Sequence, residues 1–217
     1  MNGLDFCSAI DHAEGVGRAS LSRHTSCSKE KSSLAQIPYS DPNRPEASAL
    51  AARVIEERGS ILHLYAMLMH SIPVAEGWLA FLTAIRQRCA LPGAIRELMI
   101  LEVAHLNGAR YEAEQHAPIA LREGLAAAQI RALPDWRESA LFDAAQRASL
   151  AYCDAITQSI HVPAEVFTAV RNHFDERLLV ELTATISAYN MVSRFLEALG
   201  IAATDDMRPL RTERGIT

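Results

Sequence analysis

Residues 94–124 read AIRELMILEVAHLNGARYEAEQHAPIALREG and contain two consecutive helical patterns. Apolar residues recur at helical spacing from Ala94 to about Asn107, and Gly108 ends this first helix. A second helix is predicted from Tyr111 to Glu123, with Gly124 as its terminating residue. The connection between the two is short, as is usual in helical bundles.

The helical pattern continues on both sides of this window. Further helices are predicted over residues 41–57, 61–70, 74–89, 126–133, 141–158, 164–172 and 176–199. No segment has the sustained period-two alternation of a strand. The sequence therefore predicts an all-α fold of about eight or nine helices over residues 37–205. Residues 1–36, rich in serine and charge, are expected to be a mobile tail, and residues 206–217 a C-terminal tail.

Composition excludes several classes of function. The chain of 217 residues has 21 basic and 26 acidic side chains, a net charge of −5, so nothing indicates binding to nucleic acid or to an anionic membrane. The two lysines, Lys29 and Lys31, lie near the N-terminus, which excludes a Schiff-base lysine in the helical body. The ten glycines form neither a dinucleotide-binding motif nor a phosphate-binding loop. No cofactor is predicted.

The cysteines and the N-terminus indicate the compartment. None of the four cysteines is part of a C-x-x-C motif, so neither a metal site nor a dithiol centre is predicted. Asp5 and Asp11 interrupt the apolar run that a signal peptide would need, and no stretch approaches the roughly 20 apolar residues of a membrane span. We therefore expect a cytoplasmic protein with reduced thiols.

Glu97 is the first candidate for acid/base chemistry. Helical spacing places it on one face with Leu101, Ala104 and Gly108. A buried carboxylate on such a face needs hydrogen-bonding or charged partners, or else its pKa rises and it becomes a candidate proton donor. The alternative is a solvated glutamate in the first turn, favoured by the helix dipole.

His116 is the second candidate. Glu112 lies four residues before it, so the two side chains share a helix face, and a carboxylate there would orient the imidazole and favour its charged form. Pro118 is expected to kink the helix and to free the carbonyl of Glu114 beside the histidine. The alternative is a surface Glu–His pair.

Three nearby residues complete the candidate site. Tyr111, between the two helices, could direct its hydroxyl into the same pocket or fill an interface as an aromatic. Arg110 in the connection could hold an anionic substrate or be a solvated loop residue. His105 could contact substrate, although a histidine on an apolar helix face is more often a core residue.

The quoted motifs resemble the carboxymuconolactone decarboxylase superfamily, which includes the alkyl hydroperoxidase D family. The resemblance lies in Arg96-Glu97-Leu98, in Ala104 to Gly108 and in Tyr111-Glu112-x-x-x-His116-x-Pro118, and it extends over roughly residues 50–200. It implies an alkyl hydroperoxidase D-like helical bundle that assembles into trimers, dimers or hexamers. It also implies an active site beside the kinked helix pair and close to a subunit interface.

The resemblance also bears on activity. Glu97 and His116 match the ends of the peroxidase branch's proton relay, but its two cysteine positions fall on Ala109 and Glu112, which removes the peroxidatic and resolving thiols. In the decarboxylase branch the motif histidine follows a glutamate by four residues, as His116 follows Glu112. Three hypotheses stay open: a cofactor-free decarboxylase-type enzyme acting on a small carboxylated or lactone compound, a peroxidase, and a non-catalytic helical binding module.

Overall fold

The computed structural model describes residues 35–205 and Met207. The two predicted tails, residues 1–36 and 206–217, therefore lie almost wholly outside the described residues. The described part consists of nine α-helices, two π-helical turns and one short 3-10 helix, and it contains no strand. The predicted all-α fold is confirmed.

The helices follow one another through short connections. In chain order they are α2 (Ser48–Arg58), α3 (His63–Leu68), α4 (Ile72–Thr83), the π-helical η1 (Ala84–Arg88), α5 (Gly93–Asn107), α6 (Arg110–Arg122), α7 (Ala127–Arg131), the 3-10 helix η2 (Leu133–Asp135), α8 (Ala144–Asp154), the π-helical η3 (Ala155–Ser159), α9 (Ala164–Arg171) and α10 (Glu176–Leu199). None of these helices has the length and apolar character needed to cross a membrane.

The described chain divides into two compact units. The larger unit contains residues 89–195, and so α5 to α9 and most of α10. The smaller unit contains residues 35–88 together with the described residues from position 196 onward. The domain limits predicted from the sequence, residues 37–205, stay a prediction.

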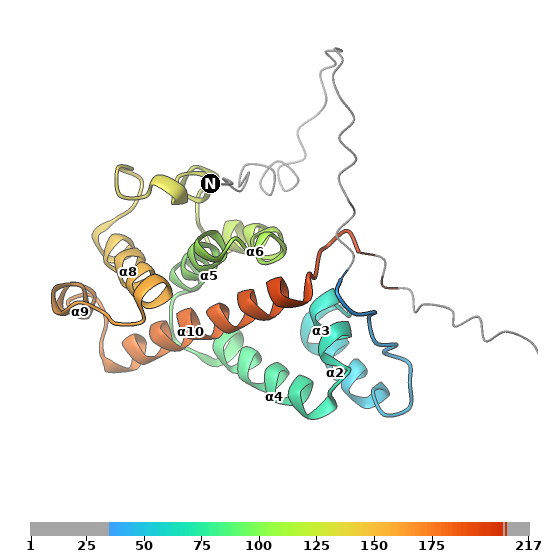
Figure 1. Cartoon of the computed structure of the whole chain (residues 1–217). Coiled ribbons are helices and arrows are strands. Elements are labelled where there is room, and N and C mark those ends of the chain that lie inside the picture. Colours follow the sequence, from blue (N-terminus) through green and yellow to red (C-terminus); the bar gives the residue numbers. More distant parts are fainter. Residues whose placement is uncertain (1–34, 206, 208–217) are drawn as a thin grey trace, which may run out of the picture. The chain divides into compact units, whose positions relative to one another are not determined.

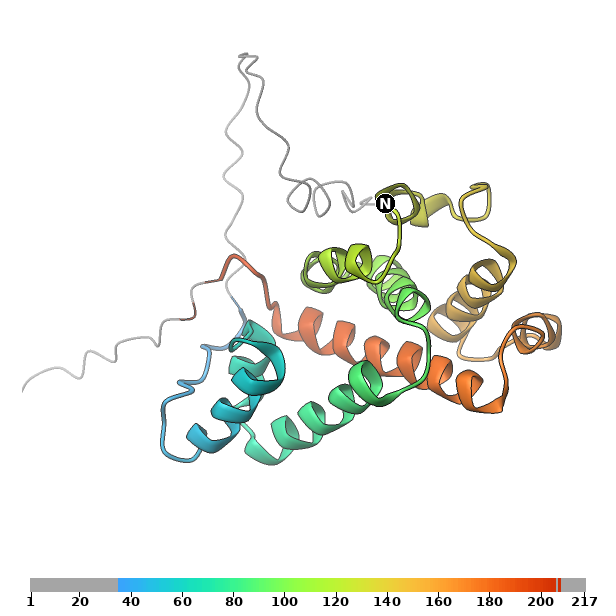
Figure 2. The same ribbon diagram turned by 180° about the vertical axis from the view of Figure 1, so that it is seen from behind.

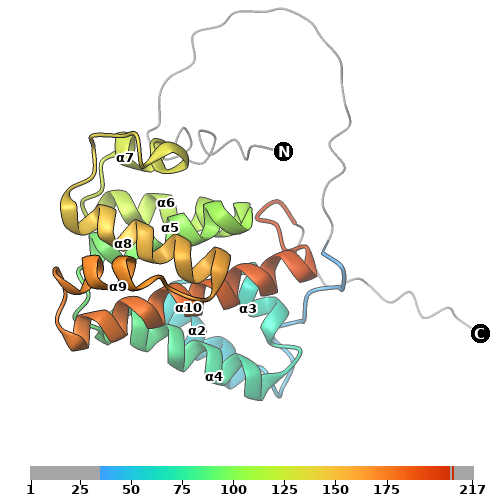
Figure 3. The same cartoon turned by 60° about the vertical axis from the view of Figure 1, so that its left-hand side comes forward.

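The core of the larger unit is built around α5. Every residue of α5 from Ile95 to Ala104 is buried, so this helix is covered on all sides. Helices α6 and α8 pack directly against it, and α9 packs against α8 (Figure 1; Figure 3). Side chains of α10, including Leu182, Ile186 and Tyr189, are also fully buried. This arrangement places α5 where side chains from several helices can reach it.

The smaller unit is a cluster of α2, α3 and α4 (blue to green in Figure 2). A buried polar group joins α2 to α4. Thr83 donates a hydrogen bond to the carboxylate of Glu57 and accepts one of 2.7 Å from Arg58. The Arg58 guanidinium also lies 5.8 Å from the centre of the Tyr65 ring, within range of a cation–π contact.

One predicted helix begins later than expected. The pattern predicts a helix from Asp41, whereas α2 begins at Ser48. Asp41 instead accepts a hydrogen bond of 2.8 Å from the backbone N–H of Asn43, which is an Asx turn. Pro45 also disfavours a helical conformation for Arg44, the residue before it.

Two predicted helices change from α-helical to π-helical hydrogen bonding near their C-terminal ends. The helix predicted over residues 74–89 is α4 followed by the π-helical η1, and the helix predicted over residues 141–158 is α8 followed by the π-helical η3. Helix α8 begins later than predicted because Asp143 caps it, accepting a hydrogen bond from the backbone N–H of Gln146. Because apolar spacing cannot distinguish one π-helical turn from an α-helical one, the sequence does not reveal either of them.

Candidate functional site

The site begins at the first turn of α5, which α10 holds in place. Glu181 of α10 accepts hydrogen bonds from the backbone N–H of Leu91 at 2.8 Å and from the side chain of Arg177 at 3.0 Å. The loop that leads into α5 is thereby fixed, and the helix starts at Gly93. This anchor sets the direction in which Arg96 and Glu97 leave the helix.

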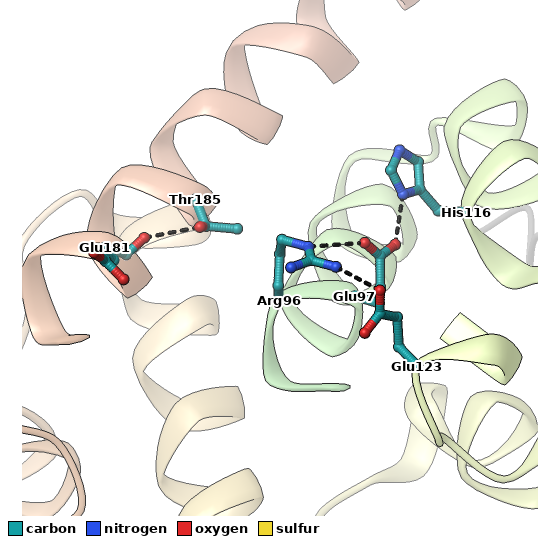
Figure 4. A network of polar contacts seen from close by, with 6 residues as sticks. All are labelled: Arg96, Glu97, His116, Glu123, Glu181 and Thr185. Atoms are coloured by element: carbon teal, nitrogen blue, oxygen red, sulfur yellow. Dashed lines mark hydrogen bonds and ion pairs between the residues drawn. The ribbon is translucent and has the colours of Figure 1, made fainter. Parts of the chain in front are cut away.

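Glu97 is completely buried and joins two helices. One carboxylate oxygen lies 2.7 Å from Nδ1 of His116 on α6, and the other accepts a hydrogen bond of 3.1 Å from Nε of Arg96. Figure 4 shows the carboxylate between the imidazole and the guanidinium, with the second ring nitrogen of His116 pointing away from Glu97. The structure thus brings together two of the predicted site residues, Glu97 and His116.

The partners of Glu97 decide its ionisation. Burial raises its pKa, but the hydrogen bond from His116 and the positive charges of His116 and Arg96 outweigh burial and hold the pKa below its ordinary value. Of the two outcomes that the sequence left open for a buried carboxyl, the structure favours the partnered carboxylate. Because the carboxylate only accepts hydrogen bonds, Nδ1 of His116 is the donor in this contact.

Arg96 also binds a second carboxylate, that of Glu123. Its terminal nitrogen donates a hydrogen bond of 2.9 Å to Glu123, just beyond the end of α6. Gly93 makes room for this contact, since a Cβ atom at that position would lie 1.7 Å from a carboxylate oxygen of Glu123. Arg96 is therefore held by two acidic side chains and is not available to bind a substrate anion.

Glu112 is buried one turn before His116, but it does not hold Nδ1 of the imidazole. Its carboxylate accepts a hydrogen bond from Oγ of Ser193 on α10. The same hydroxyl is 2.9 Å from the carbonyl oxygen of Tyr189, one turn earlier on α10. The predicted sharing of a helix face is correct, but the carboxylate bonded to Nδ1 of His116 comes from α5.

Tyr189 fixes the other side of the imidazole. Its ring meets His116 edge to face, with ring centroids 5.1 Å apart and an interplanar angle of 89°. Tyr111, which was predicted to join this site, is buried at the start of α6. The aromatic contact from α10 and the hydrogen bond from α5 together limit the rotation of the His116 side chain.

The predicted substrate-binding residues have other partners. Nε of Arg110 donates a hydrogen bond of 2.7 Å to Glu114 within α6, and its side chain is 66% exposed. Burial lowers the pKa of His105, and the charges that raise it come from Asp154 and Asp135. His105 therefore belongs electrostatically with a second acidic group.

That second group is a buried pair of carboxyls. Glu102 of α5 is 1% exposed and Asp154, the last residue of α8, is 5% exposed. Burial, the neighbouring charge of Asp154 and a hydrogen bond to it raise the pKa of Glu102 to about 9. Arg137 donates a hydrogen bond of 2.6 Å to Asp154. At neutral pH Glu102 therefore keeps its proton.

Neither of the described cysteines has the lowered pKa of a reactive thiol. Cys89 and Cys153 are both free. Burial is the main cause that raises the pKa of each, and Cys153 is fully enclosed. Among residues 35–205 and Met207, no three His, Cys, Asp or Glu side chains gather in a way that could hold a metal ion.

Sequence reasoning missed the residues that reach the site from elsewhere. Arg96 and Glu123 form an ion pair next to Glu97. Tyr189 and Ser193 reach His116 and Glu112 from α10. Ser193 gave no signal because its carboxylate partner is 81 residues away in the chain. The burial of Arg96 next to a buried Glu97 is the one part that the pattern of α5 alone could have indicated.

Comparison with known proteins identifies the family. A model of the Carboxymuconolactone decarboxylase family matches residues 73–155. The uncharacterized protein YdfG of Bacillus subtilis is 31% identical over 107 residues, 48% of this chain and 73% of that protein. The uncharacterized protein YnjA of Escherichia coli is 30% identical over 141 residues, 63% of this chain and 72% of that protein.

A solved structure agrees on the fold. A crystal structure from Ralstonia eutropha, described as an alkylhydroperoxidase AhpD core and an uncharacterized peroxidase-related protein, superposes with a TM-score of 0.65 at 18% identity. The superposition covers 81% of this chain and 92% of that one, and it confirms the predicted alkyl hydroperoxidase D-like bundle. The segment matched by the family model contains both Glu97 and His116. The chain belongs to the carboxymuconolactone decarboxylase family.

Proposed function

We propose that this protein is an acid/base enzyme of the decarboxylase type that acts on a small carboxylated or lactone compound and needs no cofactor. The observation that carries the proposal is the hydrogen bond of 2.7 Å between the buried carboxylate of Glu97 and Nδ1 of His116. A carboxylate bonded to one ring nitrogen fixes the orientation of the imidazole, the side chain that most often carries out general acid/base catalysis.

The roles of the two residues differ. Glu97 keeps its charge because its pKa is lowered, so it orients the imidazole and stabilises the imidazolium, and it does not itself donate a proton. His116 is the group that moves the proton, through Nε2. General acid/base catalysis by a positioned histidine contributes roughly a hundredfold to ten-thousandfold in rate.

A decarboxylation in this site would proceed through the following changes of bonds and protons. The bond to the carboxylate breaks, its electron pair moves into a conjugated carbonyl of the substrate, and CO₂ leaves. The resulting enolate then takes a proton on carbon from His116, which later recovers one from solvent. Glu112 and Tyr111 are the further candidates for proton transfer or for a hydrogen bond to the enolate oxygen. Both are buried on α6, with Glu112 one turn before His116 and Tyr111 at the start of the helix, which supports this assignment.

Variants at both residues test the proposal. Glu97→Gln and His116→Ala are expected to abolish release of CO₂ from a panel of small lactone acids, whereas Glu114→Gln, which breaks only the surface pair with Arg110, is the matched control. Full turnover in either site variant on the substrate so identified would refute the assignment.

A second readout separates catalysis from passive binding and does not depend on the substrate. The titration of the His116 ring, followed by NMR, should move to lower pH in Glu97→Gln because the charge that favours the imidazolium is gone. A titration curve that is the same in the wild type and in Glu97→Gln and Glu112→Gln would favour a non-catalytic binding module.

Thiol peroxidase chemistry is the competing function. The peroxidase-related description of the Ralstonia structure suggests it, but Ala109 and Glu112 stand at the two thiol positions of that branch. A thiol-dependent peroxide assay on the purified protein decides the question. Peroxide consumption that disappears in Cys89→Ser or Cys153→Ser would replace acid/base chemistry as the proposed function.

A further inference from the structure

The acid/base site still needs a group that binds a substrate anion. Arg110, the residue expected for this role, is paired with Glu114, and Arg96 is held by Glu97 and Glu123. A guanidinium already engaged by carboxylates has little capacity left for another anion. The anion-binding residue must therefore be sought elsewhere in the larger unit.

Arg194 of α10 has neutral partners. Its NH1 nitrogen donates to the carbonyl oxygen of Asn190 at 3.2 Å and to the side-chain oxygen of the same residue at 2.6 Å. Within the described residues it forms no ion pair with a carboxylate, and its residue is exposed. The remaining N–H groups of its fork are directed at neither of these oxygens, and a guanidinium fork matches a carboxylate in two hydrogen bonds.

Asn190 makes this guanidinium rigid. The amide of Asn190 is 8% exposed, and its nitrogen donates to Thr157 at 2.9 Å and to the carbonyl of Ile186 at 3.0 Å. Its oxygen accepts from Asn107, at the end of α5, at 3.1 Å as well as from Arg194. All four hydrogen-bonding positions of the amide are used, so the oxygen that holds Arg194 cannot turn away. Preorganisation of this kind strengthens ligand binding.

The position of Arg194 on α10 connects it to the acid/base site. Tyr189 and Ser193, which contact His116 and Glu112, come from the same stretch of helix. Arg194 directly follows Ser193, so its side chain leaves α10 about 100° around the helix axis from the one that binds Glu112. The Arg194 guanidinium therefore lies beside the face of α10 that contacts His116 and Glu112.

We propose that Arg194, oriented by Asn190, is the residue that binds a carboxylate of the substrate and so selects anionic compounds. This inference rests on the proposed function for the substrate class, and Arg194 would determine specificity without acting in proton transfer. Loss of its charge-assisted hydrogen bonds should therefore weaken binding and leave the proton-transfer groups intact.

Benzoate is a suitable probe, with benzamide as its neutral isostere. Titrations followed by the NMR signals of the arginine side chains should give a dissociation constant for the wild type that increases about tenfold to a hundredfold in Arg194→Gln. Arg194→Lys should fall between the two, because an ammonium group lacks the fork. Benzamide should bind weakly to all three.

The matched control is Arg122→Gln. Arg122 is an exposed arginine at the end of α6 that takes part in none of the hydrogen bonds or ion pairs of this site, so its loss removes the same charge without the preorganised geometry. Benzoate affinity unchanged in Arg194→Gln, absent from the wild type, or reduced equally in Arg122→Gln would overturn the proposal. Tighter binding of inorganic phosphate than of benzoate would overturn the assignment to a carboxylate.

The same variants distinguish failure of the acid/base proposal from failure of the Arg194 proposal. His116→Ala should retain the wild-type affinity for benzoate, because the imidazole is not part of the Arg194 group. If Glu97→Gln and His116→Ala were active but Arg194→Gln lost benzoate, the function would be wrong and the anion site correct. If Glu97→Gln and His116→Ala were inactive but Arg194→Gln kept its affinity for benzoate, only the Arg194 proposal would be refuted.

Discussion

The buried carboxyl pair of Glu102 and Asp154 gives a sharp prediction about stability. The raised pKa, about 9 against 4.5 for an ordinary glutamate, means that the folded protein keeps a proton which the unfolded chain has already released. Because the folded state binds more protons over this range, stability falls as the pH rises from about 4.5 to about 9. Above that range the folded protein also loses the proton and the dependence ends.

The magnitude follows from the size of the shift. Each pH unit in this window removes about 1.4 kcal/mol of unfolding free energy, so about three units, from near pH 5 to near pH 8, remove about 4 kcal/mol. That is a large part of the roughly 5–15 kcal/mol that stabilises most domains. In Glu102→Gln the amide donates to Asp154 at every pH, and this part of the pH dependence disappears.

Urea unfolding followed by far-UV circular dichroism at a series of pH values measures the effect. The wild type should become less stable with rising pH, Glu102→Gln should stay nearly level, and the variant should be the more stable of the two at the alkaline end. Glu138→Gln, an exposed glutamate of the same unit, is the control and should follow the wild type. Parallel curves for the wild type and Glu102→Gln would refute the shared proton.

Three further changes test other parts of the larger unit. Ser193→Ala should lower the unfolding free energy by about 1–3 kcal/mol, because the buried carboxylate of Glu112 loses a donor; a loss below about 0.5 kcal/mol in urea unfolding would contradict this. Cys153 should resist iodoacetamide in the folded protein and react in urea, as peptide mass spectrometry can check, because burial raises its pKa and blocks access. Gly93→Ala should displace Glu123 yet change the melting temperature little, since the Glu123 side chain is 39% exposed and can turn into solvent. The lost ion pair, worth about 1 kcal/mol, is offset by the helix preference of alanine. A loss of more than about 2 kcal/mol would show that Glu123 cannot move aside.

Much of the fold could be predicted because apolar spacing, caps and terminating glycines are local. The ends of α5 and α6 at Gly108 and close to Gly124 were readable, and α10 has its predicted limits. Helix α6 runs through Pro118, as the predicted helix of residues 111–123 required, and the predicted kink there stays a prediction. A helix can include a proline when tertiary packing supplies enough stability, and this balance is not written in the local sequence.

The candidate site was predicted only in part, for a related reason. Spacing of four residues indicates that Glu112 and His116 can meet, but it does not say whether another carboxylate competes for the imidazole. In the fold, α5 brings Glu97 to Nδ1 of His116, while α10 supplies Ser193 to Glu112. Contacts of this kind depend on how helices pack, and a single sequence contains no direct record of them.

The distribution of charge around His116 argues for proton transfer and against thiol chemistry. Glu97 is tied to Arg96 and stays ionised, so the imidazole has one fixed carboxylate and one ring nitrogen that points away from it (Figure 4). Glu112, a second buried carboxyl, stands at a position that the resemblance assigns to a redox cysteine of the peroxidase branch. A carboxyl can exchange a proton but cannot be oxidised and reduced in a catalytic cycle. This supports the proposal that the site moves protons and not electrons.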